Sequence, residues 1–242
     1  SNDVAVFSRT IDEYSFSRDT ARGIMLVVHS RGSITGDGTD RIINIETLRF
    51  SDGNGGTTDY SYAQLFNVAA AGTLAVDLGT SGTNAVLTLA PGTITDADLV
   101  SPDNPTGAIT SANMRTSWSL VDPVTGVATL ITGTGNLSVR ADGALVAGTT
   151  PVTGQIVRGF VGAQDLFGYI DGVSKDYNLI VGTAAGETLT GLNNETLGDA
   201  IHGLAGNDII NGQRGADLID GGDGNDQLTG GEGNDVVRGG NG

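Results

Sequence analysis

Aspartates recur every nine residues near the C-terminus of the chain, and their neighbours could hold a cation. The copy that runs from Gly203 to Asn211 carries an aspartate in its sixth position, and three further copies follow it. Glycine-rich turns precede these aspartates, and such turns can point several carbonyl groups at one spot. Carboxylate and carbonyl oxygens suit Ca²⁺, which accepts roughly six to eight such ligands. The spacing predicts a row of calcium sites built on Asp208, Asp217, Asp226 and Asp235.

The repeat has the template G-G-x-G-x-D-x-U-x, where U is an aliphatic residue. Its first six residues predict a turn, in which the fifth-position asparagines tolerate a left-handed conformation. Its last three residues predict a short strand with one inward side chain, too little apolar burial for a copy to fold alone. The copies must therefore stack. An acidic glycine-rich linker is the alternative, but it has no reason to place these aliphatic residues after each aspartate: Ile210, Ile219, Leu228 and Val237.

Imperfect copies flank the four regular ones. Residues 182–190 carry Glu187 in the aspartate slot, and residues 191–202 form one copy lengthened by three residues, with Asp199. Gln213-Arg214 departs from the template, although backbone carbonyls survive any side chain. A fifth copy opens at Gly239, so we expect a unit over residues 179–242 that is truncated at its end.

Residues 203–242 resemble the calcium-binding nonapeptide repeats of secreted bacterial repeat-in-toxin (RTX) proteins, which wind into a parallel β-roll. The resemblance implies that consecutive turns alternate between two sides of the roll and that each calcium lies between turns two repeats apart. Asp208 would then share an ion with Asp226, Asp217 with Asp235, and Asp199 with Asp217 at a weaker third site, while Glu187 is a further candidate ligand. Turn carbonyls would complete the ligand set, from Gly203, Ala205, Gly212, Arg214, Gly221, Asp223, Gly230 and Glu232.

Composition narrows the function further. The net charge of −16 disfavours nucleic acid and anionic lipid as partners and attracts cations. Residues 182–242 hold 17 of the 39 glycines and ten acidic residues against two arginines, which marks a separate unit. Cysteine is absent, so disulfides and thiolate chemistry are excluded. No apolar run approaches the roughly 20 residues that a membrane-spanning helix needs.

The first 56 residues predict a β-rich segment. Apolar stretches such as 4–7, 24–28 and 41–50 alternate with polar or glycine turns. The stretch 45–53 loosely resembles the β-rich segments that follow repeat blocks in RTX proteins, and residues 2–5 resemble the tail of a truncated repeat. Asp40 and Asp3 are therefore further candidate calcium ligands, with an ordinary acidic turn as the alternative.

Residues 57–178 predict a β-sandwich, because short Thr-, Val- and Leu-rich runs are separated by turns every 8–12 or so residues. The segment weakly resembles immunoglobulin-like modules, and we expect Trp118 in its core. Cadherin-like modules bind calcium in acidic loops, which makes the carboxylates near residue 100 candidates, although solvated loop carboxylates are the simpler interpretation. These carboxylates are Asp96, Asp98 and Asp103.

A search for catalytic motifs ends without a candidate. The chain has no G-x-S-x-G elbow, H-E-x-x-H, P-loop or Rossmann fingerprint, and it has a single lysine. We therefore expect an all-β, non-catalytic calcium-binding module of a larger bacterial protein, secreted or at the cell surface, that serves as a scaffold and secretion-compatible spacer. The alternatives are an adhesin segment that binds a glycan or protein, and the non-catalytic tail of a secreted protease, lipase or peroxidase.

Overall fold

The computed structural model describes residues 3–19, 24–29, 39–43, 45, 47–61, 69–99, 106–132, 135–148, 150–164 and 170–242. Its regular elements are β-strands apart from two single-turn 3₁₀ helices, η1 (Ile11–Glu13) and η2 (Ala97–Leu99). The expected all-β class is confirmed. The chain divides into two compact units, one of residues 1–72, 93–113 and 162–172, the other of residues 73–92, 114–161 and 173–242.

The first unit holds two small sheets. Its strands are β1 (Val4–Phe7), β2 (Tyr14–Asp19), β3 (Ile24–His29), β4 (Thr39–Ile42), β5 (Thr47–Ser51) and β6 (Thr57–Ser61). Strand β5 pairs in parallel with β1 and antiparallel with β6, whereas β2, β3 and β4 form an antiparallel sheet. Phe7, Tyr14 and Phe50 are buried together, with ring centroids 4.8–5.3 Å apart, so aromatic packing supplies this core.

The second unit begins with two facing sheets. Trp118 is fully buried, as expected, and its indole Nε1 donates a hydrogen bond of 3.1 Å to the carbonyl of Gly143. A Cβ at Gly159 would lie 2.8 Å from Leu89 and 3.1 Å from Trp118, so a glycine is needed where the sheets meet. The strands concerned are β7 (Ala75–Ser81), β8 (Asn84–Ala90), β9 (Arg115–Val121), β10 (Ala128–Leu130), β11 (Leu137–Val139), β12 (Leu145–Ala147), β13 (Val152–Gln164) and β14 (Ile170–Val181).

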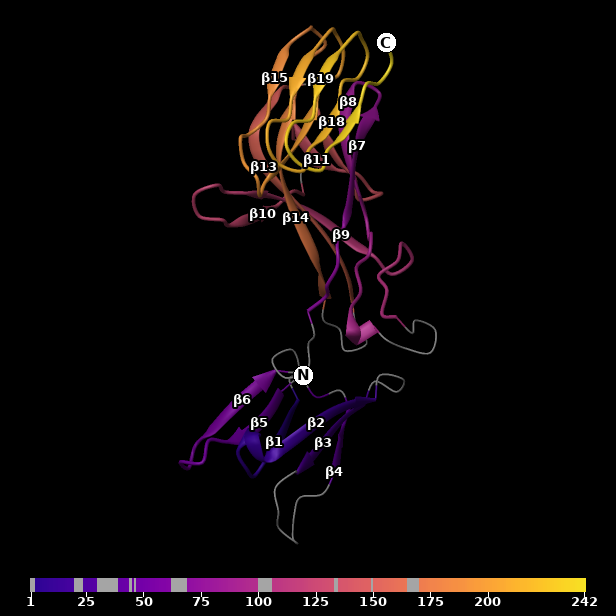
Figure 1. Ribbon diagram of the computed structural model, residues 1–242. Helices are drawn as coiled ribbons and strands as arrows, with labels where there is room; N and C mark the ends of the chain where they lie inside the picture. The colour runs from indigo at the N-terminus through magenta and orange to yellow at the C-terminus, as the bar shows by residue number, and fades with distance from the viewer. Residues whose placement is uncertain are drawn as a thin grey trace. The chain divides into compact units, whose positions relative to one another are not determined.

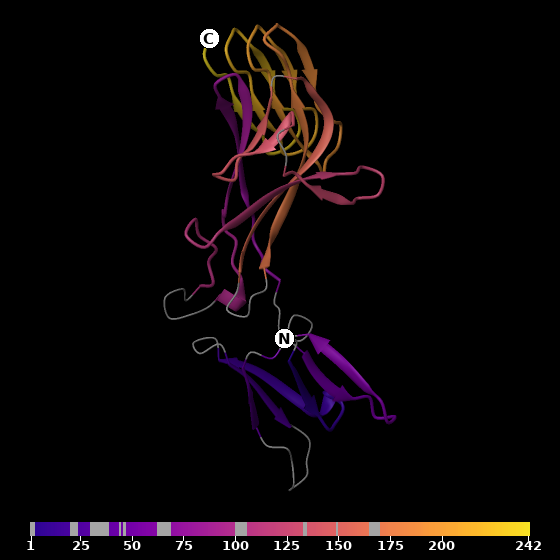
Figure 2. The same ribbon diagram turned by 180° about the vertical axis from the view of Figure 1, so that it is seen from behind.

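The repeats form a parallel β-roll, as expected (Figures 1 and 2). Successive strands alternate between two sheets, so each strand pairs with the strand two repeats away. Ile201, Ile210 and Ile219 fill the space between the sheets and are at most 1% exposed, whereas Val237 on the edge strand is 45% exposed. The strands are β15 (Thr188–Thr190), β16 (Gly198–His202), β17 (Ile209–Asn211), β18 (Leu218–Asp220), β19 (Gln227–Thr229) and β20 (Val236–Arg238).

One sheet joins the roll to the strands before it. Strand β14 pairs in parallel with β16, with Asn178 opposite Asp199, and the sheet has the order β10-β9-β13-β14-β16-β18-β20. Backbone pairing therefore continues across the boundary expected near residue 179. Strand β14 gives the first roll strand a partner that belongs to no repeat.

From Gly203 onward, the regular turns of the roll place left-handed residues at their second and fourth positions. Among the described residues, the non-glycine residues with positive φ are Leu204 (75°) and Gln213 (76°), both in second positions. The fifth-position asparagines tolerate this conformation but do not adopt it. Glycine takes the fourth position in the four regular copies, and at Gly224, for example, a Cβ would overlap the carbonyl of Gly206 in the neighbouring turn.

Candidate calcium site

Strand pairing stacks the acidic residues of the roll in two columns. One column contains Asn178, Asp199, Asp217 and Asp235, and the other contains Glu187, Asp208 and Asp226. Asp199, Asp208 and Asp217 are at most 1% exposed. The fold therefore brings together the residues that the sequence pairs two repeats apart.

Backbone amides hold one oxygen of each carboxylate. The amide of Asp208 donates to Oδ1 of Asp226 at 2.9 Å, and the amide of Asp217 donates to Oδ1 of Asp235 at 3.1 Å. The amides of Asp199 and Glu187 bind Asp217 and Asp208 in the same way, both at 2.8 Å. This ladder orients the carboxylates, because one oxygen of each is committed to the neighbouring turn.

The other oxygen of three aspartates is buried without a hydrogen-bond donor. Among the described residues, Oδ2 of Asp208, Asp217 and Asp226 has no partner. Burial raises the pKa of Asp217 to about 6, with its amide hydrogen bond opposing the rise and the neighbouring Asp199 and Asp235 adding to it. Burial likewise raises the pKa of Asp208. An uncompensated buried carboxylate is costly, and a bound cation would remove that cost, so these residues fit calcium.

Carbonyl groups lie beside these free oxygens. A Cβ at Gly203 would overlap both Asp208 Oδ2 and the carbonyl oxygen of Gly221. A Cβ at Gly212 would likewise overlap Asp217 Oδ2 and would lie 2.5 Å from the carbonyl oxygen of Gly230. The first-position carbonyls proposed as ligands are thus next to the carboxylates, in a space that only glycine keeps open.

The third-position carbonyls hold the turns together. Those of Asp223 and Glu232 accept the amides of Gly206 and Gly215 at 2.8 and 3.0 Å, which leaves each a second lone pair. Ala205 and Arg214 occupy the same positions and form bridges with Asp223 and Glu232. Their assignment as ligands stays a prediction.

Side chains alone do not surround an ion here. Within the described ranges, no group of three or more Asp, Glu, His or Cys residues is arranged to hold a metal. Each candidate ion site has one or two carboxylates nearby, so carbonyl oxygens must supply most of the remaining ligands. That donor set is the one that Ca²⁺ prefers.

The first acidic residue of each column is satisfied by protein donors instead. The side-chain amide of Asn178 donates to Oδ1 of Asp199 at 2.5 Å, and the amide of Leu192 donates to Oδ2 at 2.9 Å. Glu187 accepts the amide and the hydroxyl of Thr183 at 2.7 and 2.6 Å. The sequence offered no sign of Asn178, because β14 has no repeat pattern. Burial still raises the pKa of Asp199, and these hydrogen bonds oppose the rise.

The candidate ligands outside the roll are not brought together by any described contact. Asp3 is exposed just before β1, and Asp40 lies in β4, where its side chain is not described. Asp96 is 1% exposed, and its amide donates to the carbonyl of Gly107 at 2.8 Å. The Asp98 side chain and the whole of Asp103 lie outside the described residues. Calcium binding at these residues stays a prediction.

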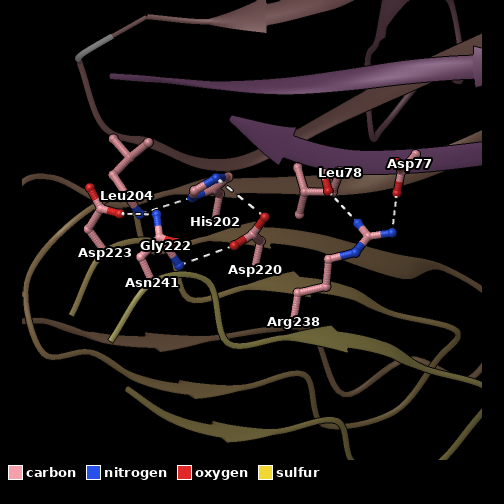
Figure 3. A network of polar contacts seen from close by, with 9 residues as sticks. All are labelled: Asp77, Leu78, His202, Leu204, Asp220, Gly222, Asp223, Arg238 and Asn241. Atoms are coloured by element: carbon pink, nitrogen blue, oxygen red, sulfur yellow. Dashed lines mark hydrogen bonds and ion pairs between the residues drawn. The ribbon is translucent and has the colours of Figure 1, made fainter. Parts of the chain in front are cut away.

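A second polar row follows the ninth position of alternate repeats (Figure 3). His202, Asp220 and Arg238 are stacked in register on β16, β18 and β20. His202 is fully buried, and burial lowers its pKa, although Asp220 opposes this at 3.8 Å between Nε2 and Oδ2. Arg238 binds the β7 strand through the Leu78 carbonyl and the Asp77 carboxylate, both at 2.5 Å. This row attaches the roll to β7.

Comparison with protein families identifies the repeats. Residues 196–228 and 214–242 match the model for the RTX calcium-binding nonapeptide repeat (4 copies). No curated protein and no solved structure matched the chain. Within the described ranges, none of the helices has the length and apolar character to cross a bilayer. The C-terminal part of the chain, from residue 196 onward, therefore carries RTX calcium-binding repeats.

Proposed function

We propose that this chain is a non-catalytic segment of a larger secreted bacterial protein, and that its roll folds when it meets extracellular calcium. The observation that carries the proposal is the row of buried, unpartnered oxygens on Asp208, Asp217 and Asp226. The roll would then act as a scaffold, and as a spacer that passes unfolded through a secretion channel.

The physical basis is a change in the balance of charge and chain entropy. Residues 182–242 carry ten acidic side chains against two arginines and bury few aliphatic side chains, so self-repulsion and chain entropy oppose folding without a cation. Calcium that binds only the folded state adds RT ln(1 + [L]/Kd) for each independent site. At a tenfold excess of calcium over Kd, this is about 1.4 kcal/mol for each site. Two or three sites would be enough to fold a marginal roll.

Calcium titration of the whole 242-residue chain tests this proposal. We expect calorimetric binding of several ions, and strong amide protection over residues 203–242, where the unpartnered oxygens lie, only when calcium is present at millimolar concentration. Asp226→Asn should lose affinity, whereas Asp142→Asn, at an exposed carboxylate paired with Arg140, should not. Strong protection of residues 203–242 at submicromolar calcium, or no heat of binding, would refute the proposal.

An adhesive function is a second candidate, favoured by one cavity. A space of about 630 Å³ lies between the β7–β8 turn and the roll, and its polar side chains include Thr80, Thr83, Asp220, Asp223 and Asn241. Hydroxyl, carboxylate and amide groups can bind the hydroxyls of a glycan. A glycan array probed with the whole chain, with and without calcium, would separate this function from a purely structural one.

A further inference from the structure

The second-position amide binds one of two kinds of acceptor in the five turns that begin at residues 182, 191, 203, 212 and 221. In the first two turns it binds the carboxylate of its own repeat: Thr183 donates to Glu187 Oε2 at 2.7 Å, and Leu192 to Asp199 Oδ2 at 2.9 Å. Those oxygens are the counterparts of the free oxygens in the later turns. An amide hydrogen in that place occupies the carboxylate and repels a cation.

In the next three turns the second-position amide points away from the carboxylate of its own repeat and binds a side chain of the preceding copy. Leu204 donates to His202 Nδ1 at 2.9 Å, Gln213 to Asn211 Oδ1 at 3.0 Å, and Gly222 to Asp220 Oδ1 at 3.1 Å. Figure 3 shows the first and third of these bonds. These are the three turns whose aspartates, Asp208, Asp217 and Asp226, keep a buried Oδ2 without a partner.

The acceptor is in each case the residue in the ninth position of the preceding copy. His202, Asn211 and Asp220 carry an acceptor atom two bonds beyond Cβ, which can bind the amide two residues later. Val181 and Thr190 occupy this position before the first two turns, and there the amide binds the carboxylate. In the five turns that begin at residues 182, 191, 203, 212 and 221, the partner of the amide therefore follows the ninth residue of the preceding copy.

We propose that His202, Asn211 and Asp220 are positioning residues that select which carboxylates bind calcium. By holding the second-position amide, they leave one oxygen of Asp208, Asp217 and Asp226 free for the ion. The inference rests on the proposed calcium-dependent function and explains which aspartates of the roll bind the ion.

Backbone conformation supports this role. Leu204 and Gln213 have positive φ, which is unfavourable for residues with a Cβ. In both, the amide is the one bound by the ninth-position side chain, so that bond helps to hold the conformation in which the amide points away from the carboxylate. His202 acts here as an acceptor through Nδ1, which explains a buried histidine without making it a metal ligand.

Asn211 offers the cleanest test, because it is only half-buried and Thr229 provides a matched control beside it on β19. Calcium binding of the whole chain would be measured by calorimetry for the wild type, Asn211→Ala, Asn211→Asp and Thr229→Val. We expect Asn211→Ala to weaken one site about tenfold or more, because calcium would have to break the hydrogen bond that the Gln213 amide then makes to the charged Asp217 carboxylate. Asn211→Asp keeps the acceptor and should retain wild-type affinity, as should Thr229→Val.

Amide exchange at Gln213 separates this role from simple support of the turn. In Asn211→Ala held folded by millimolar calcium at its other sites, the Gln213 amide should stay protected, because it can bind Asp217 Oδ2 as its counterpart binds Asp199. Exposure of that amide, or equal affinity in Asn211→Ala and the wild type, would overturn the inference, as would equal losses in Asn211→Ala and Asn211→Asp. A wild-type chain that binds no calcium would instead refute the proposed function itself.

Discussion

The side-chain amide of Asn178 should make the start of the roll independent of calcium. Asn178 is 1% exposed on β14, and its amide donates to the buried carboxylate of Asp199 at 2.5 Å. We expect strand β16 to stay folded in EDTA, so that limited proteolysis begins beyond His202 and leaves a core that contains Trp118.

Asn178→Ala would remove this donor and leave a carboxylate oxygen buried. A hydrogen bond to a charged group contributes about 1.5–3 kcal/mol, and both of these groups are almost completely buried, so the full range applies. In EDTA, amide exchange of β16 should therefore accelerate roughly 10- to 150-fold. Asn136→Ala is a suitable control, because Asn136 donates its side-chain amide at 2.9 Å to the Thr150 carbonyl, in an exposed position away from the roll.

Asn178→Asp tests the same contact in the opposite direction. Two adjacent carboxylates should destabilise the calcium-free chain further, but they should also create a calcium site that the wild type lacks. Calorimetry should find one more bound ion, and calcium should restore the protection of β16. If Asn178→Ala changes β16 exchange less than twofold, or calcium fails to rescue Asn178→Asp, the amide does not take the place of a cation.

The remaining predictions concern the roll itself. Asp217→Ala should reduce calcium affinity more than Asp235→Ala, because Asp217 bonds with the turns on both sides of it; equal losses in calorimetry would contradict this. Gly203→Ala should abolish the neighbouring calcium site and lower the free energy of unfolding by about 1–3 kcal/mol, since its methyl would overlap Asp208 Oδ2. Gly79→Ala is the control, because its methyl would meet no atom within 4 Å, and urea unfolding with calcium present compares the two variants. Without calcium, the raised pKa of Asp217 makes the protonated form the stabilising one, so circular dichroism in EDTA should find the roll most ordered below about pH 4 and less ordered as pH rises through about 6. Saturating calcium should reverse that trend, because the ion needs the ionised carboxylate.

The roll could be predicted from the sequence because each repeat carries both its turn residues and its calcium ligand within nine residues. The spacing of Asp208, Asp217 and Asp226 determines both the turn and the partner two copies away, so local pattern and tertiary contact coincide. Asn178 could not be predicted in this way. It contacts Asp199 only because β14, which has no repeat pattern, pairs with β16, the first strand of the repeats in that sheet. The sequence also did not predict which carboxylates keep a free oxygen and which are bound by a backbone amide. That difference depends on the ninth residue, a position that the template leaves unspecified.

Because strands alternate between two sheets, the number of repeats between two residues decides whether they lie in the same sheet. Residues eighteen positions apart share a sheet, whereas residues nine apart lie on opposite sheets. Removal of residues 203–220 would keep Arg238 in the row that binds Asp77, but removal of residues 203–211 would move Arg238 to the sheet of β15, β17 and β19, although every remaining copy would still match the template. The nonapeptide is the unit of the sequence, but a pair of nonapeptides is the unit by which this roll can change length and stay attached to β7.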